Sequence, residues 1–148
     1  MITIENKIEI CASIEQVWSV LIDREQYSLW NPVIHSQSGD FKVGAAAKMR
    51  INPGLFPMNV NIEYRQIKTN QELSWFGGPP LIKGHHYFKL EATSNGHTQL
   101  IHGETFGVLP SILAGPAIVT LVKMKYKMAD IAFKKRCELL FPSAASAA

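Results

Sequence analysis

Apolar and polar residues alternate along most of the chain, in short stretches separated by turn-forming residues. Alternation of this kind predicts strands with one buried face. The separators include Asn52-Pro53-Gly54, Gly77-Gly78-Pro79-Pro80 and Asn95-Gly96, and the last of these is typical of a tight hairpin. One strand is predicted at 3–11, and about six more follow at 33–37, 45–51, 58–65, 73–75, 85–91 and 100–106. Because the connections are short, these later strands are expected to form an antiparallel meander.

Helical periodicity replaces this alternation in three places. Ser13 and Gln16 form a capping box at the start of a helix whose apolar stripe is Val17, Trp18, Leu21 and Ile22. A second short helix is predicted at 23–27, and it ends at Trp30-Asn31-Pro32. A long helix is predicted over 117–140, where no Gly or Pro interrupts the chain. Its apolar face is predicted at Leu121, Met124, Met128, Ile131 and Ala132, widened by Val122, Tyr126, Ala129 and Phe133.

The order of these elements predicts an α+β fold. A curved antiparallel sheet is expected to wrap around the long C-terminal helix, with two short helices after the first strand. The 148 residues suit one domain, which is predicted to cover 1–142. Residues 143–148 are small and polar, and they are predicted to be a disordered tail.

This order, together with several local strings, resembles the START-like superfamily, also called helix-grip or SRPBCC, and especially its polyketide-cyclase/dehydrase-like branch. The strings that carry the resemblance are residues 14–21, Asp23 with Tyr27, Trp30-Asn31-Pro32, Leu73-Ser74-Trp75, residues 84–88 and residues 98–107. The resemblance implies a deep cavity between the sheet and the C-terminal helix that binds lipids, polyketides, hormones or other apolar molecules. Some members of the superfamily catalyse cyclisation, aromatisation or dehydration in that cavity, so the fold alone does not decide the function.

A ligand pocket is predicted from the residues that alternation and helical spacing place on inward faces. Methionine is flexible and polarisable, so several methionines near the helix–sheet interface suit an adaptable apolar lining. Plain core packing is the alternative for any one of them. The predicted lining is Met49, Met58, Val60, Ile62, Leu73, Trp75, His86, Phe88, His102, Glu104, Phe106, Leu121, Met124 and Met128.

Three polar residues are predicted to share the inward face of two paired strands: His86, His102 and Glu104. A His–Glu hydrogen bond would satisfy buried polar groups or anchor the polar end of a ligand. In a catalytic interpretation, His86 or His102 is a general base whose tautomer Glu104 determines. A zinc site is a third interpretation. It is disfavoured, because two-residue spacing on strands is common by chance, and no metal or other cofactor is predicted.

Apolar residues are also predicted on three loops that meet at one end of the sheet. They are Leu55, Phe56, Leu81, Leu109, Ile112 and Leu113. Such a cluster suggests an entrance rim or a surface for a partner. The alternative is that these side chains pack on one another over the end of the sheet.

Composition restricts the partners of the protein. The net charge of +3 is modest, which argues against a nucleic-acid partner. The N-terminus lacks the pattern of a signal peptide, and no apolar run reaches the ~20 residues needed to span a bilayer. The chain is therefore expected to be cytoplasmic, without integral membrane association, as a monomer or homodimer.

Three functions follow from these features. The first is the binding of a small hydrophobic ligand of lipid, polyketide or aromatic type. The second is a cofactor-independent enzyme of the polyketide cyclase/dehydrase type, with His86, His102 and Glu104 as candidate catalytic residues. The third is lipid transfer, or regulation of a partner, through the apolar rim.

Overall fold

The computed structural model describes residues 1–54, 56–107 and 115–143. Within these residues, seven strands form one antiparallel sheet in the order β1-β7-β6-β5-β4-β3-β2. The strands are β1 (Ile2–Ile10), β2 (Ile34–Gly39), β3 (Ala46–Ile51), β4 (Met58–Lys68), β5 (Glu72–Gly78), β6 (Gly84–Ala92) and β7 (Thr98–Phe106). The helices are α1 (Ile14–Ile22), the 3-10 helix η1 (Arg24–Leu29) and α2 (Pro116–Leu140).

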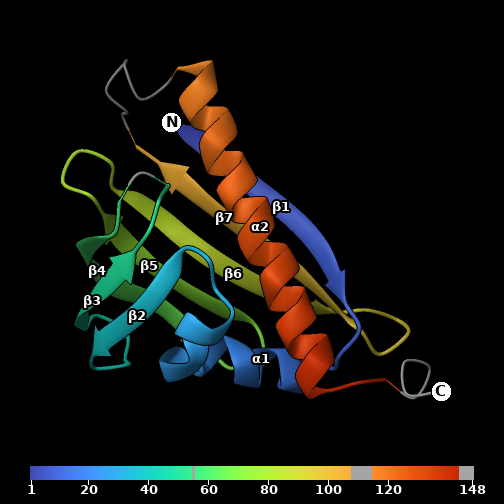
Figure 1. Ribbon diagram of the computed structural model, residues 1–148. Helices are drawn as coiled ribbons and strands as arrows, with labels where there is room; N and C mark the ends of the chain where they lie inside the picture. Colours follow the sequence, from blue (N-terminus) through green and yellow to red (C-terminus); the bar gives the residue numbers. More distant parts are fainter. Residues whose placement is uncertain (55, 108–114, 144–148) are drawn as a thin grey trace.

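The sheet curves around α2, which crosses one of its faces obliquely (Figure 1). Helices α1 and η1 lie at one end of this arrangement, below the C-terminal half of α2. The loops β3–β4 and β5–β6 lie at the opposite end, where β7 also ends. The predicted α+β order of strand, two short helices, six strands and a long helix is confirmed.

Local sequence explains how the short helices close the lower end. The capping box is present: the Gln16 amide donates to Ser13 Oγ, and the Ser13 amide donates to Gln16 Oε1. The second helix is a 3-10 helix that extends to Leu29, slightly beyond the predicted range. Directly after it, the Trp30 ring packs between Tyr27 and Phe133, at centroid distances of 4.9 and 5.1 Å. These contacts join η1 to α2.

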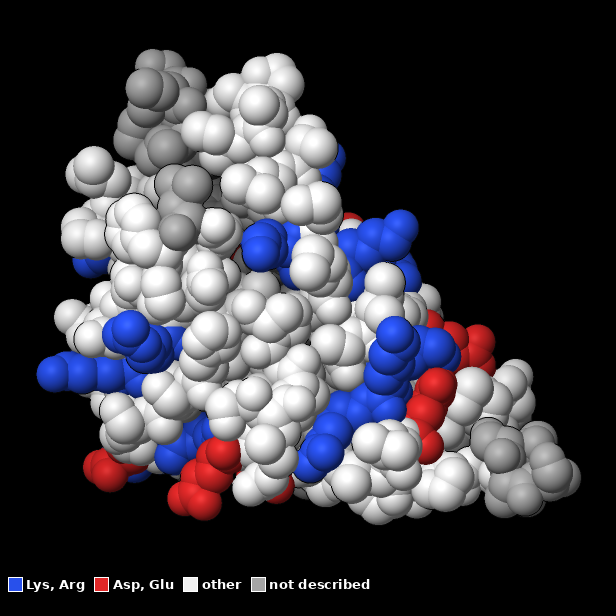
Figure 2. All heavy atoms as spheres, in the orientation of Figure 1, with Lys and Arg blue, Asp and Glu red and all other residues white. Residues whose placement is uncertain are grey.

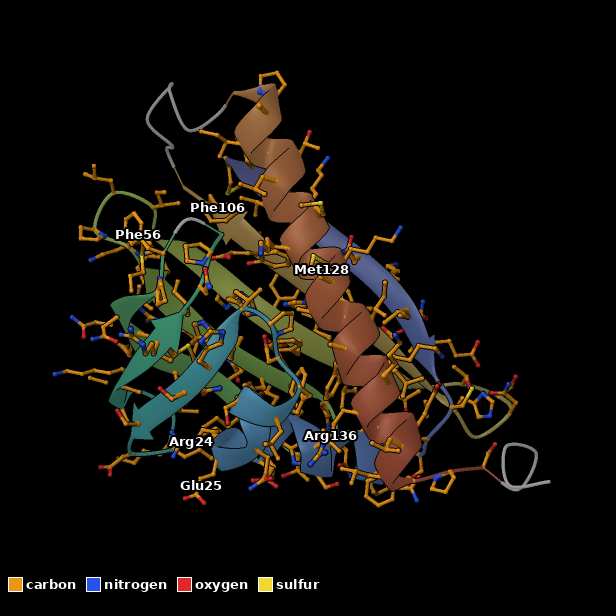
Figure 3. All side chains as sticks on the ribbon, viewed as in Figure 1. Arg24, Glu25, Phe56, Phe106, Met128 and Arg136 are labelled. Atoms are coloured by element: carbon orange, nitrogen blue, oxygen red, sulfur yellow. The ribbon has the colours of Figure 1, made fainter. Side chains whose placement is uncertain are left out.

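The predicted apolar face of the long helix is wrong at its methionines, whereas Ala129 and Phe133, which were also predicted on it, are buried. Met124 and Met128 are 50% and 43% exposed, and Figure 3 shows Met128 on the outer side of α2. The residues that α2 buries are Ala129, Asp130, Phe133 and Cys137. The predicted stripe was chosen by hydrophobicity alone and therefore left out the acidic Asp130. As a result, its centre was placed too close to the methionines. Nothing in the described part of α2, or of any other described helix, is long and apolar enough to cross a bilayer.

Candidate ligand-binding site

A cavity of about 190 Å³ lies between α2 and the concave face of the sheet. Its walls are mostly aliphatic and aromatic, with a small number of polar side chains on one side. For scale, an apolar cavity of about 150 Å³ is large enough to bind benzene. The cavity therefore has room for a single ring or a short aliphatic chain.

Much of the predicted pocket lines this cavity. The predicted residues that do so are Met49, Val60, Ile62, Trp75, His86, Phe88, His102, Glu104 and Phe106. Those outside its lining are Met58, Leu73, Leu121, Met124 and Met128. Leu73 is fully buried in the core, and Met58 packs against the core from the start of β4. Met124 and Met128 are outside because α2 turns them to solvent.

A row of hydrogen-bonded polar side chains forms one wall of the cavity. His102 Nδ1 is hydrogen-bonded to Asp130 Oδ1, and His102 Nε2 lies 3.0 Å from His86 Nε2. His86 Nδ1 in turn lies 3.1 Å from the Tyr126 hydroxyl, which donates to Glu104 Oε2. We call these five residues the polar chain. It runs from Asp130, which is 3% exposed, to Glu104, whose side chain is 14% exposed, and both residues line the cavity.

Strand register explains why these residues meet. His86 pairs with Glu104, and Phe88 pairs with His102, between β6 and β7. Residues of equal parity share a face of the sheet, so the predicted common face of the three polar residues is what the register produces. Helix α2 adds Tyr126 and Asp130, which are one turn apart and therefore on the same helix face.

Aromatic rings hold both imidazoles in place. The His86 ring stacks on Trp75 with a centroid distance of 4.4 Å and an interplanar angle of 6°. The His102 ring stacks on Phe88 at 4.2 Å and 11°. At the Asp130 end, Asn6 Nδ2 donates to Asp130 Oδ2 at 3.0 Å. Rings fixed in this way can form only the hydrogen bonds that lie in their planes, so the order of the polar chain is determined by packing.

The predicted pairing of histidine with Glu104 is present at His86 but not at His102. The carboxylate that binds His102 is Asp130, and Glu104 is 3.5 Å from His86 Nδ1 with the Tyr126 hydroxyl hydrogen-bonded to both. Sequence reasoning missed Asp130 and the chemical role of Tyr126. The available signal was an acidic residue between Ala129 and Phe133, two residues already assigned to the inward side of the helix.

Metal ligation by the two histidines does not fit this geometry. The Nε2 atoms of His86 and His102 bind each other, so neither is directed at a shared third point. In the described ranges, no group of three His, Cys, Asp or Glu side chains is arranged to hold a metal ion.

The part of the cavity at the loop end of the sheet, which we call its mouth, is lined by a lysine. Pro53, Gly78, Pro79 and Ile82 line the cavity there. Lys125 also lines it, with its Cε 3.4 Å from where a Cβ on Gly54 would stand. No ion pair joins Lys125 to another residue in the part of the chain that the structure describes. An uncompensated ammonium group therefore borders an otherwise apolar mouth.

The predicted entrance rim is described only in part. Phe56 and Leu81 are 60% and 74% exposed at this end, whereas Leu55, Leu109, Ile112 and Leu113 lie outside the described residues. Figure 2 shows few charged side chains on the upper part of this face, around the described start of α2. Charged side chains gather lower on the same face, along α2 and near α1.

Burial changes the acid–base behaviour of the polar chain. Removal from water lowers the pKa of His86 below its usual 6.5, and the nearby His102 lowers it further, while Glu104 opposes both. Burial also raises the pKa of the Tyr126 hydroxyl well above 10, and the neighbouring Glu104 adds to this effect. His86 and Tyr126 are therefore both neutral near pH 7.

The shifted pKa of His86 predicts a loss of stability in mild acid. As pH falls below about 6.5, the unfolded chain binds a proton at this histidine that the folded protein does not, so the free energy of unfolding decreases. A His86→Phe variant lacks this contribution and is expected to lose less stability between pH values of about 7.5 and 5.5. Urea unfolding at both pH values measures the difference, and equal pH slopes for the two proteins would contradict the prediction.

The fold and the cavity together define the class of the protein as a helix-grip protein of the START-like, SRPBCC superfamily, which confirms the resemblance noted in the sequence. The Zhui aromatase/cyclase from Streptomyces sp. R1128 matches with a TM-score of 0.76 and 13% identity, over 97% of this chain and 97% of that chain. A START superfamily protein from Mycobacterium smegmatis matches with a TM-score of 0.76 and 17% identity, over 93% and 98%. At these identities the similarity shows the fold.

The family within this class is shown by the sequence. The sequence model of the family described as "Activator of Hsp90 ATPase homolog 1-like protein" matches residues 11–103, which is more than half of the chain. The chain belongs to this family. Among curated proteins, the sequence has no match.

Proposed function

We propose that this protein binds a small, largely apolar ligand in the cavity between α2 and the sheet, with a polar group of the ligand at Glu104 and Tyr126. The observation that carries the proposal is a cavity of about 190 Å³ whose apolar walls are interrupted by a single polar side. Sites of this kind, apolar with a few polar groups that converge, are typical of small-molecule binding. One structural neighbour is an aromatase/cyclase, which is consistent with a carbon-rich ligand.

The size of the cavity supports a ligand with about one ring. Trp75, Phe88 and Phe133 provide flat aromatic walls, and Met49 adds a side chain that adapts its shape. A ring between such walls would bury most of its surface. Burial of apolar surface contributes about 25 cal/mol per Å², so this contact would provide most of the binding free energy.

The polar chain supports an oriented ligand. Glu104 Oε2 and the Tyr126 hydroxyl bind each other, but no described residue donates to Glu104 Oε1. A hydroxyl or an acidic hydrogen on the ligand would satisfy this oxygen. Lys125 at the mouth provides a donor for an acceptor group at the other end of the ligand.

Native mass spectrometry of freshly purified protein, followed by solvent extraction, tests the proposal. We expect a stoichiometric adduct that extraction releases as a small organic molecule. Phenol serves as the probe for protein that carries no adduct, with binding measured through the fluorescence of the cavity tryptophans. Protein that carries no adduct and does not bind phenol, but co-sediments with liposomes, would contradict the proposal and favour lipid transfer.

Filling the cavity from α2 is expected to abolish binding. Ala129 is buried and lines the cavity, so an Ala129→Leu side chain would occupy the space of the ligand. Ala132 is half-buried on the same helix outside the cavity lining, which makes Ala132→Leu the matched control. We expect phenol affinity to fall at least tenfold in Ala129→Leu and to be unchanged in Ala132→Leu. Equal affinities for the two variants would show that the ligand lies elsewhere.

A further inference from the structure

The Tyr126 hydroxyl connects Glu104 to the two histidines of the polar chain. Four links join Asp130, His102, His86, Tyr126 and Glu104, and each link needs one hydrogen. The Tyr126 hydroxyl has a single hydrogen and lies between Glu104 Oε2 and His86 Nδ1. Because Tyr126 donates to Glu104, this hydrogen is not available to His86.

A proton that arrives on Glu104 would free the hydrogen of the Tyr126 hydroxyl. The protonated carboxyl group, after a half turn, can donate to the Tyr126 oxygen. The Tyr126 hydroxyl is then free to donate to His86 Nδ1. His86 already bonds His102, and His102 bonds Asp130, so every link then holds one hydrogen. Tyr126 can therefore donate to His86 once Glu104 has accepted a proton.

The cavity side of Glu104 is open to such a proton. A Cβ built on Gly84 would lie 2.5 Å from Glu104 Oε1, so the carboxylate occupies space that exists only because residue 84 is glycine. Glu104 also lines the cavity, and its side chain keeps 14% of its surface exposed. A carboxylate held at this position can contact a hydrogen of a ligand bound between the aromatic walls.

Lys125 provides the complementary charge. When a C–H bond next to a carbonyl loses its proton, the negative charge moves to the carbonyl oxygen. Lys125 lines the same cavity and has no ion-pair partner in the part of the chain that the structure describes. Its ammonium group can therefore pair with an oxyanion that forms at the mouth while Glu104 acts farther inside.

We propose that the cavity is a general-base site for small carbon acids, in which Glu104 removes a proton from carbon and Lys125 stabilises the resulting oxyanion. The inference rests on the proposed function, since it requires a ligand in the cavity. The substrate class is a compound of about one ring with an acidic C–H next to a carbonyl. The C–H bond breaks, its electron pair becomes the carbon–carbon double bond of an enolate, and the proton moves to Glu104. Return of that proton to another atom of the same molecule completes an isomerisation that needs no further reactant.

The residues of the site divide into two roles. Glu104 and Lys125 are the catalytic residues, because they contact the reacting atoms. His86, His102 and Asp130 are positioning residues that act through Tyr126. The negative charge of Asp130 favours a proton on the chain, so an Asp130→Asn variant should move the acid limb of the pH–rate profile to lower pH. A purely structural role would change the rate without moving this limb.

The probe for the experiment is 5-nitrobenzisoxazole, which opens when a base removes its single acidic C–H. The C–H electron pair forms a nitrile, the N–O bond breaks, and its electron pair leaves on oxygen as a coloured phenolate. The reaction needs only a base, so it tests Glu104 without knowledge of the natural substrate. The phenolate oxygen also tests stabilisation of an oxyanion by Lys125.

We expect Glu104→Gln to lower the rate constant about 100-fold, within the usual contribution of a general base. Lys125→Met is expected to lower it about tenfold. Gly84→Ala is a second variant that displaces the Glu104 carboxylate without removing it, and it should also lose most of the activity. Glu63→Gln is the matched control, because Glu63 is half-exposed beside Arg65 and does not line the cavity.

Binding of the probe is measured separately, by quenching of tryptophan fluorescence. If the probe binds and turnover in Glu104→Gln equals that of the wild type, the general-base site is refuted while the binding function stands. If the probe and phenol both fail to bind, the proposed function is refuted and this inference with it. Activity that is lost in Glu104→Gln and Gly84→Ala, but kept in Glu63→Gln, supports the site.

Discussion

Replacing Asp130 by alanine is expected to lower the free energy of unfolding by about 3 kcal/mol or more, because it leaves two donors without acceptors. The carboxylate accepts hydrogen bonds from His102 Nδ1 and from Asn6 Nδ2. Asp130 and His102 are each 3% exposed, so water cannot replace the lost acceptor at the histidine. Each buried group left unpaired costs about 1–3 kcal/mol. Urea unfolding followed by tryptophan fluorescence measures the loss.

Two companion variants separate hydrogen bonding from volume. Asp130→Asn keeps an acceptor for His102, and Asn6 can turn its amide to match it, so the loss should be less than half that of Asp130→Ala. The double variant His102→Phe, Asp130→Leu removes both partners together and should recover part of the stability, since replacing both members of a polar pair is often nearly neutral. If Asp130→Ala unfolds at the wild-type midpoint, Asp130 is not the acceptor that the structure shows.

Replacing Phe133 by alanine is the second change with a large expected effect, about 3–5 kcal/mol of unfolding free energy, as is usual for a buried phenylalanine. Phe133 is 1% exposed, packs on Trp30 and also lines the cavity. Its ring belongs at once to the core and to the wall of the site. Loss of the ring therefore weakens the contact between α2 and η1 and joins the vacated space to the cavity.

This enlargement gives a second measurement. Phe133→Ala is expected to shift binding from phenol toward the two-ring 1-naphthol, with the affinity ratio changing at least tenfold. Phe76→Ala is the control, because Phe76 is 39% exposed on the sheet and outside the cavity lining, and it should change neither stability by more than about 1 kcal/mol nor the affinity ratio. A variant that is destabilised but keeps the wild-type affinity ratio would place the ligand away from Phe133.

The two predictions concern adjacent residues of the same helix face with different chemistry. Asp130 stabilises the protein through hydrogen bonds, and Phe133 stabilises it through packing, yet both lie beside the cavity. Stability and ligand binding are therefore coupled along this part of α2. Changes that improve packing around Phe133 are expected to reduce the space for a ligand.

Alternation and turn chemistry in the sequence determined the sheet. Side chains on a strand alternate between its two faces, so the pattern alone predicts that Met49, Trp75, His86 and Glu104 face inward, and these four residues line the cavity. The capping box at Ser13 and the Asn95-Gly96 turn are equally local, since the residues that interact are close in sequence. Such features need no knowledge of distant parts of the chain.

The tertiary structure alone decided the orientation of α2 and the partners in the polar chain. Met124 and Met128 were expected to face inward, but burial of Asp130 rotates the helix so that the methionines meet solvent. A charged side chain can be buried when a hydrogen-bonding partner is present in the interior. The partner of Asp130 is His102, which is 28 residues away in sequence. Hydrophobic periodicity measures only the tendency of each side chain to leave water. It contains no information about which polar groups form hydrogen bonds between distant parts of the chain, and such hydrogen bonds determine this site.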